Sequence, residues 1–280
     1  MRNARIRPEI RSIIIMGIFF YSMVISQVSI SPTTLFLNDK SNSGTILVLN
    51  GTENDLEVSV EYMFGYSQSD EFGKLTMVYD DEEIANKYSA NNWIKGFPQK
   101  FILQAGQRQT VRLIVRRPGN IEDGTYWTRI KTTSNDVSRI IEDRATEGVS
   151  AKIAFQFEQI TSFYYKNGDV NTTMRIENSR ISINESSLTI YSDFVRGGNS
   201  PFLGSMIANI KNESGKIVKD GISFVSVYFD GTRKLDIDKT DLAPGKYSAE
   251  ISFISERADI PKEDIIQTET VTSIVEFELK

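Results

Sequence analysis

Short runs of β-forming residues recur along most of the chain, and this feature constrains the fold more than any other. The runs are rich in Val, Ile, Thr, Phe and Tyr, and clusters of Gly, Asn and Asp separate them. They are Thr45–Leu49, Leu56–Phe64, Thr110–Val115, Tyr126–Thr132, Val149–Phe157, Thr172–Ile176, Ser187–Tyr191, Ser205–Ile210, Phe224–Phe229, Tyr247–Ile254 and Thr270–Glu278. Many short strands joined by turns are typical of an all-β sandwich or barrel. Only Asp81–Tyr88 has the composition of a helix.

The run at 149–157 shows the alternation most clearly. Its apolar face carries Val149, Ala151, Ile153, Phe155 and Phe157, and the polar residues Ser150, Lys152, Gln156 and Glu158 lie on the other face. A period of two predicts a strand with one buried face. The same row of apolar side chains is also suited to pairing with another β protein.

Two segments resemble each other and suggest how many domains the chain has. Ile121–Tyr126 and Leu242–Tyr247 both follow the pattern apolar-x-x-Gly-x-Tyr, and both lead into an alternating strand. This is the pattern of a tyrosine corner, in which a Tyr at the start of a late strand bonds to the backbone upstream. Two corners roughly one domain length apart predict two tandem immunoglobulin-like β-sandwiches, 27–158 and 159–280, with the boundary near 159–166. The alternative is two ordinary glycine turns.

The N-terminus has the three parts of a secretory signal peptide. Arg2, Arg5, Arg7 and Arg11 precede the apolar run 13–25, and Ser26 ends a plausible cleavage motif. The pattern predicts a signal peptide over 1–26 and a periplasmic product, or alternatively a secreted or cell-surface one. A buried N-terminal helix or an uncleaved anchor is the other interpretation. No later stretch is long and apolar enough to span a membrane, so the mature form is not expected to cross one.

Histidine and cysteine are both absent from the 280 residues. Their absence excludes His/Cys zinc sites, His-based triads, thiol nucleophiles and disulfides. We therefore expect no enzyme, no cofactor and no metal, although a hydrolase with a Ser/Lys or carboxylate site is a third hypothesis. The acidic run 80–83 favours a helix start, with a hard-cation site as its alternative. With a net charge of −5 and no basic stripe, nucleic acid is not expected as a partner.

The first half resembles a known family in three stretches. Residues 29–37 (SISPTTLFL) are similar to the first strand of the PapD-like periplasmic pilus and fimbrial chaperones, and 45–50 (TILVLN) to their second. The most specific stretch is 101–118 (FILQAGQRQTVRLIVRRP), which is followed by the Asp-Gly-x-Tyr corner. The resemblance covers roughly residues 27–157 and is that of a divergent member.

This resemblance implies two immunoglobulin-like domains set at an angle, with a cleft that grips a pilus subunit. In the family, an Arg in the first strand and a Lys in the last strand of domain one anchor the subunit's carboxylate. Here Thr34 stands at the Arg position, and the Lys position falls near Ala154. Lys152 lies two residues before Ala154, on the same face of the strand, and is the candidate to take the place of that Lys.

The sequence therefore predicts a chaperone-like protein that binds a pilus, fimbrial or other surface β-subunit by strand-edge pairing. The candidate partner-binding residues are Lys152, Arg112, Val149, Ala151, Ile153 and Phe155. Arg112 belongs to an alternating basic run that either meets an anionic partner or is a solvated face. The alternative function is an exported structural or adhesive module without chaperone activity, in which the 149–157 face is fully buried.

Overall fold

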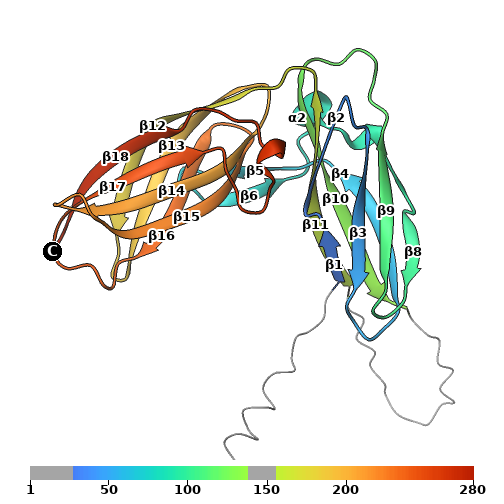
Figure 1. Ribbon diagram of the computed structural model, residues 1–280, viewed down its shortest axis with the longest axis horizontal. Coiled ribbons are helices and arrows are strands. Elements are labelled where there is room, and N and C mark those ends of the chain that lie inside the picture. Colours follow the sequence, from blue (N-terminus) through green and yellow to red (C-terminus); the bar gives the residue numbers. More distant parts are fainter. Residues whose placement is uncertain (1–27, 138–155) are drawn as a thin grey trace, which may run out of the picture.

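The computed structural model describes residues 28–137 and 156–280, which form two β-sandwiches that meet at an angle (Figure 1). The expected signal peptide at 1–26 lies outside the described residues, as do positions 138–155. The expected fold class, all-β with two sandwiches in tandem, is confirmed. Within the described ranges, no helix is long and apolar enough to cross a membrane.

The first sandwich consists of two facing sheets, with strand orders β1-β3-β9-β7 and β2-β11-β10-β4-β8. All neighbours are antiparallel except β2 and β11, which run parallel. The strands are β1 (Val28–Ser31), β2 (Thr34–Asn38), β3 (Ser43–Asn50), β4 (Leu56–Met63), β7 (Ile94–Phe97), β8 (Lys100–Leu103), β9 (Arg108–Val115), β10 (Gly124–Asp136) and β11 (Gln156–Asn167).

The core of this sandwich forms from alternate residues of its strands. On β9, Val111, Leu113 and Val115 are buried, and the residues between them are exposed. They share one hydrophobic cluster with Val58 and Phe163 of the opposite sheet. Burying each such side chain stabilises the fold by about 1.5–3 kcal/mol, and in a chain without disulfides this packing carries the stability.

The second sandwich pairs the sheet β12-β13-β16 with the sheet β15-β14-β17-β18. Its core cluster contains Ile190, Ile210, Ile251 and Phe253, all fully buried. The strands are β12 (Thr172–Ile183), β13 (Ser187–Gly198), β14 (Phe202–Asn212), β15 (Ile217–Val227), β16 (Gly231–Asp238), β17 (Gly245–Ile254) and β18 (Val271–Leu279), with the short 3-10 helix η2 (Lys262–Asp264) before β18.

Both tyrosine corners predicted from the sequence are present. The hydroxyl of Tyr126 donates to the carbonyl of Glu122 at 3.0 Å, and that of Tyr247 donates to Ala243 at 2.7 Å. The glycine two residues before each tyrosine has nearly the same positive φ, 155° at Gly124 and 154° at Gly245. One corner lies in each sandwich, so the repeated motif marks two copies of one architectural feature.

Removing either corner hydrogen bond should weaken its own sandwich only. We expect Tyr126→Phe and Tyr247→Phe each to lower the free energy of unfolding by about 1 kcal/mol, the net value of one such bond. The double variant should show the sum, because the two sites are independent. Denaturant unfolding of the three variants measures this, and a loss in the double variant well above the sum would contradict the two-sandwich description.

The first sheet extends beyond the boundary expected at 158/159. Strand β11 pairs with β10 through Asn167, and with β2 from Ser162 to Lys166. Gly168, with φ of +60°, then starts the turn that leads to β12. Because the ladder of the first sheet is unbroken up to Asn167, we place the division between the sandwiches at 168–171.

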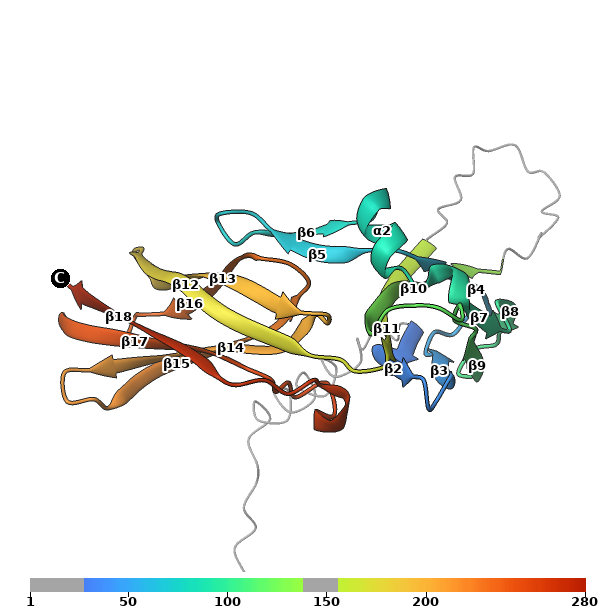
Figure 2. The same ribbon diagram turned by 90° about the horizontal axis from the view of Figure 1, so that it is seen from above.

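An insertion between β4 and β7 reaches over the second sandwich. It contains β5 (Tyr66–Ser69), β6 (Leu75–Val78), the helix α2 (Glu82–Tyr88) and the 3-10 helix η1 (Asn91–Trp93). Figure 2 shows the β5–β6 hairpin lying alongside the second domain. Ser67 Oγ donates to the carbonyl of Ser226 at 3.2 Å, and Ser69 Oγ accepts from the amide of Thr232 at 3.1 Å. The hairpin therefore fixes the two sandwiches to each other.

Candidate partner-binding site

The first half of β11 is a sheet edge. Residues 156–161 pair with β10 on one side, whereas β2 begins to pair on the other side only at Ser162. Figures 1 and 2 place β2 and β11 on the side of the first sandwich that faces the second. Within the described residues, the outer side of 156–161 has no strand partner. Such an edge is a template for pairing with another chain.

The backbone groups that face outward can be assigned from one hydrogen bond. The amide of Ser162 donates to Thr33 O at 3.0 Å, on the β2 side of the strand. Backbone directions alternate along a strand, so Glu158 and Ile160 point their N–H and C=O groups to the same side. These two residues therefore offer an unpaired row of donors and acceptors. We call Gln156–Thr161 the β11 edge.

Two apolar side chains are exposed along the β11 edge. Phe157 is 54% exposed and Ile160 is 44% exposed. Phe157 is also the last member of the alternating row at 149–157 and its only described one. Its exposure disagrees with the expectation for a purely structural module, in which that face is buried. Glu158 and Ile160 lie on the face of the strand opposite to Phe157, and Glu158 pairs with Lys131 of β10 at 2.8 Å.

Most of the predicted binding residues lie in the part of the chain that is not described. Val149, Ala151, Lys152, Ile153 and Phe155 all fall within 138–155.

Arg112 is described and is exposed on β9, opposite Thr45 and Phe97. That strand belongs to the four-stranded sheet, whereas the β11 edge belongs to the other sheet. The structure therefore does not bring Arg112 to the edge that faces the second domain.

A buried arginine lies beside the position where the family resemblance implies an anchor. Thr34 is the cross-strand partner of Ser162, and neither side chain is charged. The guanidinium of Arg129, on the neighbouring β10, donates to the hydroxyl of Ser162. The sequence alone placed Arg129 only on an extension of the positive face of Arg112, because the alternation of β10 gives no sign that one of its charged residues faces the second domain.

Arg129 joins the two sandwiches. Its Nε donates to the carbonyl of Gly65 at 3.0 Å, and its Nη2 donates to the hydroxyl of Tyr228, in the second domain, at 2.8 Å. Burial lowers the pKa of Arg129, but the neighbouring oxygens of Tyr228 and Tyr164 outweigh it and leave that pKa above its usual value. Burial raises the pKa of Tyr228 well above 10, so the phenol stays neutral and accepts the hydrogen bond from the charged guanidinium of Arg129.

Aromatic rings surround this contact and form the junction cluster. Tyr228 lies 4.9 Å from Trp127 and 6.4 Å from Tyr164, measured between ring centroids. The cluster buries Phe64, Tyr66, Trp127, Tyr164, Leu203, Tyr228, Ile260 and Ile265. Its residues come from both sandwiches and from the insertion, so it fixes the angle at which the β11 edge faces the second domain.

The acidic run at 80–83 supports the junction rather than a metal site. Asp81 is the N-cap of α2 and accepts from the amide of Ile84 at 3.0 Å and from the hydroxyl of Tyr66 at 2.8 Å. The interpretation as a helix start is confirmed. In the two described ranges, no three acidic side chains converge as metal ligands would.

Ionisation of the Tyr66 phenol should lower the free energy of unfolding in alkaline solution. Burial, and then its bond to Asp81, raise the pKa of Tyr66 from 10.0 to about 12. The unfolded chain loses this proton near pH 10 and the folded chain near pH 12, so the stabilisation is complete below pH 10 and is lost as pH rises to 12. We expect Tyr66→Phe to show a smaller decrease than the wild type between pH 9 and pH 11.5, measured by urea unfolding. Equal decreases would contradict the assignment.

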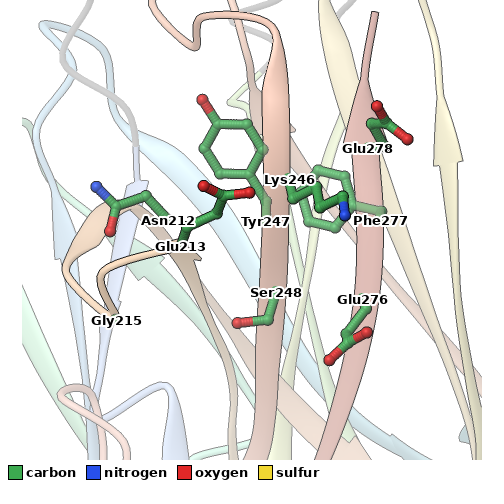
Figure 3. A pocket seen from close by; sticks show the side chains of 9 residues that line it. All are labelled: Asn212, Glu213, Gly215, Lys246, Tyr247, Ser248, Glu276, Phe277 and Glu278. Carbon is green, nitrogen blue, oxygen red and sulfur yellow. The ribbon is translucent and has the colours of Figure 1, made fainter.

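A cavity of about 580 Å³ lies in the second sandwich and is lined by none of the residues of the β11 edge (Figure 3). It opens beside the second tyrosine corner, at the far end of β17 and β18, with Tyr247 stacked on Phe277. Glu213, Glu276 and Glu278 lie around it. Lys246 is the one basic residue among those that line it.

Comparison with known proteins gives structural relatives only. No protein-family model and no curated protein matches the sequence. The chain is similar to the YadV chaperone, with 10% identity and a TM-score of 0.45 over 90% of this chain and 100% of that one. It is also similar to the CsuC–CsuE chaperone–tip subunit complex of Acinetobacter baumannii, with 12% identity and a TM-score of 0.43 over 88% and 98%.

A third similar structure is the SafA pilin in complex with the SafB chaperone of Salmonella enterica, with 12% identity and a TM-score of 0.43 over 89% of this chain and 97% of that one. The three similar structures are thus one chaperone and two complexes of a chaperone with a subunit. At these identities and TM-scores, the similarity assigns neither a client nor a binding mechanism.

Proposed function

We propose that this protein is an exported, chaperone-like binding protein. Its client is another β protein of the pilus, fimbrial or surface-subunit class, and the client pairs as an added strand along the β11 edge. The client class follows from the sequence resemblance, and the export follows from the signal-like N-terminus.

One observation carries the proposal: the β11 edge is open within the described residues. Natural proteins protect sheet edges with proline, charge, bulges or covering segments. Among the strands that the structure describes, none pairs with the outward groups of Glu158 and Ile160, and the side chains of Phe157 and Ile160 are exposed on the two faces of this edge. A strand that adds at this edge gains main-chain hydrogen bonds, and its register is set by alternating side chains.

The geometry of the junction supports the same function. Arg129 and the junction cluster hold the two sandwiches at a fixed angle, so the β11 edge is presented in one orientation to a client. Presenting a rigid edge avoids the entropic cost of ordering it during binding. A cationic side chain also lies on β11 within the described residues: the Nζ of Lys166 is 5.1 Å from the centre of the Phe36 ring on β2.

Co-expression with a fimbrial subunit of the source organism tests the proposal. We expect a 1:1 complex in size-exclusion chromatography, and a subunit that is lost to aggregation or proteolysis when expressed alone. If the subunit is equally soluble with and without this protein and the two elute separately, the protein is better described as a structural or adhesive module.

A further inference from the structure

A second buried arginine, Arg233 on β16, forms no ion pair with any acidic residue in 28–137 or 156–280. The residue is 6% exposed, and its Nη2 donates to the carbonyl of Ser226 at 2.8 Å. Its Nε and Nη1 are buried without a hydrogen-bond partner. A buried guanidinium with two unused nitrogens is costly unless an anion neutralises it.

No acidic side chain of the described part of the chain supplies that anion. Burial is what lowers the pKa of Arg233 from 12.5 to about 10, with no carboxylate opposing it. The carboxylate of Asp259 already accepts two hydrogen bonds from the guanidinium of Arg257, at 2.9 and 2.5 Å. The ring of Phe194 lies 5.8 Å from the guanidinium carbon and gives only a weak cation–π contact.

Arg233 lines a pocket of about 230 Å³ between the β5–β6 hairpin and the second sandwich. Arg257 and Lys234 also line the pocket, together with Ser67 of the hairpin and Ser226 of β15. No Asp or Glu is among the lining residues. Three cationic side chains and three serines, Ser67, Ser223 and Ser226, line this small space. Because Arg257 is already paired with Asp259, Arg233 and Lys234 are the lining cations that an oxyanion would neutralise.

We propose that this pocket binds a small oxyanion group, a phosphate or a carboxylate, with Arg233 as its principal ligand. Because the hairpin comes from the first domain and Arg233 from the second, the bound anion would also strengthen the link between them. The proposal does not depend on strand pairing at the β11 edge, because none of the residues of that edge lines this pocket.

Thermal unfolding at constant ionic strength tests the proposal. Inorganic phosphate should raise the unfolding midpoint of the wild-type protein above its value in chloride, because an anion that binds only the folded state stabilises it. Arg233→Met should bind phosphate at least ten-fold more weakly. In chloride alone this variant should be as stable as the wild type or more so, because an unpaired buried charge has been removed.

Arg175→Met is the matched control, since Arg175 is an exposed arginine of the same domain that pairs with Glu177. It should keep the phosphate response of the wild type. Acetate in place of phosphate distinguishes the two ligand classes: a shift with both indicates a carboxylate-compatible pocket, and a shift with phosphate alone indicates a phosphate site. No shift with either anion, or an equal shift in Arg233→Met, overturns the proposal.

Discussion

Replacing Ile160 with proline is expected to weaken client binding by about 30-fold or more, the effect of losing roughly 2 kcal/mol of strand pairing. The amide of Ile160 points to the open side of β11, as the bond from Ser162 to Thr33 indicates. Proline removes this donor and places a ring in the path of an incoming strand. It should cost little stability, because proline is tolerated on an edge strand where the N–H faces away from the sheet.

Ile102→Pro provides a closely matched control. Ile102 lies on β8, the edge strand at the opposite end of the same sheet, and is 58% exposed. The amide of Val60 donates to the carbonyl of Gln99, the residue before β8, so the alternation directs the amide of Ile102 away from β4. Titration of both variants with the client should show weaker binding for Ile160→Pro only. Equal affinities would rule out the β11 edge as the binding site.

Tyr228→Ala should be the most destabilising single change at the junction, lowering the free energy of unfolding by about 3–5 kcal/mol. Tyr228 is 1% exposed and is the second-domain residue that contacts Trp127, Tyr164 and Arg129 together. Its loss leaves a cavity and removes a partner of a buried charge. Small-angle scattering should then show a broader range of distances between the sandwiches than in the wild type.

Tyr228→Phe separates the hydroxyl from the ring. It keeps the packing but removes the acceptor for Arg129 and the partner of Tyr164, so we expect a loss of about 1–3 kcal/mol with little change in the scattering curve. If the alanine variant has wild-type stability and shape, the junction cluster does not hold the domains.

Local features of the sequence predicted the fold correctly. The alternation in Thr110–Val115 became the buried row of β9, and the two Gly-x-Tyr motifs became the two corners. Both signals succeed because they act within one strand or across four residues. The helix at Asp81–Tyr88 was predictable for the same reason, since a capping carboxylate and its amide lie three residues apart.

Two local elements escaped the sequence analysis. Strand β16 was missed because charged residues such as Lys234 and Asp236 alternate with its apolar ones, and the β5–β6 hairpin was missed because its residues are mostly polar or exposed.

Contacts between distant segments could not be predicted from local patterns at all. Arg129 meets Tyr228 across 99 positions, so no spacing rule relates them. The five predicted site residues at 149–155 remain predictions, and the open edge became apparent only from the register of β2 with β11.

Amide hydrogen exchange at Glu158 and Ile160, measured by NMR with and without the client, tests strand addition most directly. In the free protein both amides should exchange rapidly, because they point to the open side of β11. In the complex both should become strongly protected, while the amide of Ile102 on the opposite edge should not change. If Glu158 and Ile160 exchange as fast in the complex as in the free protein, the client does not pair with this strand.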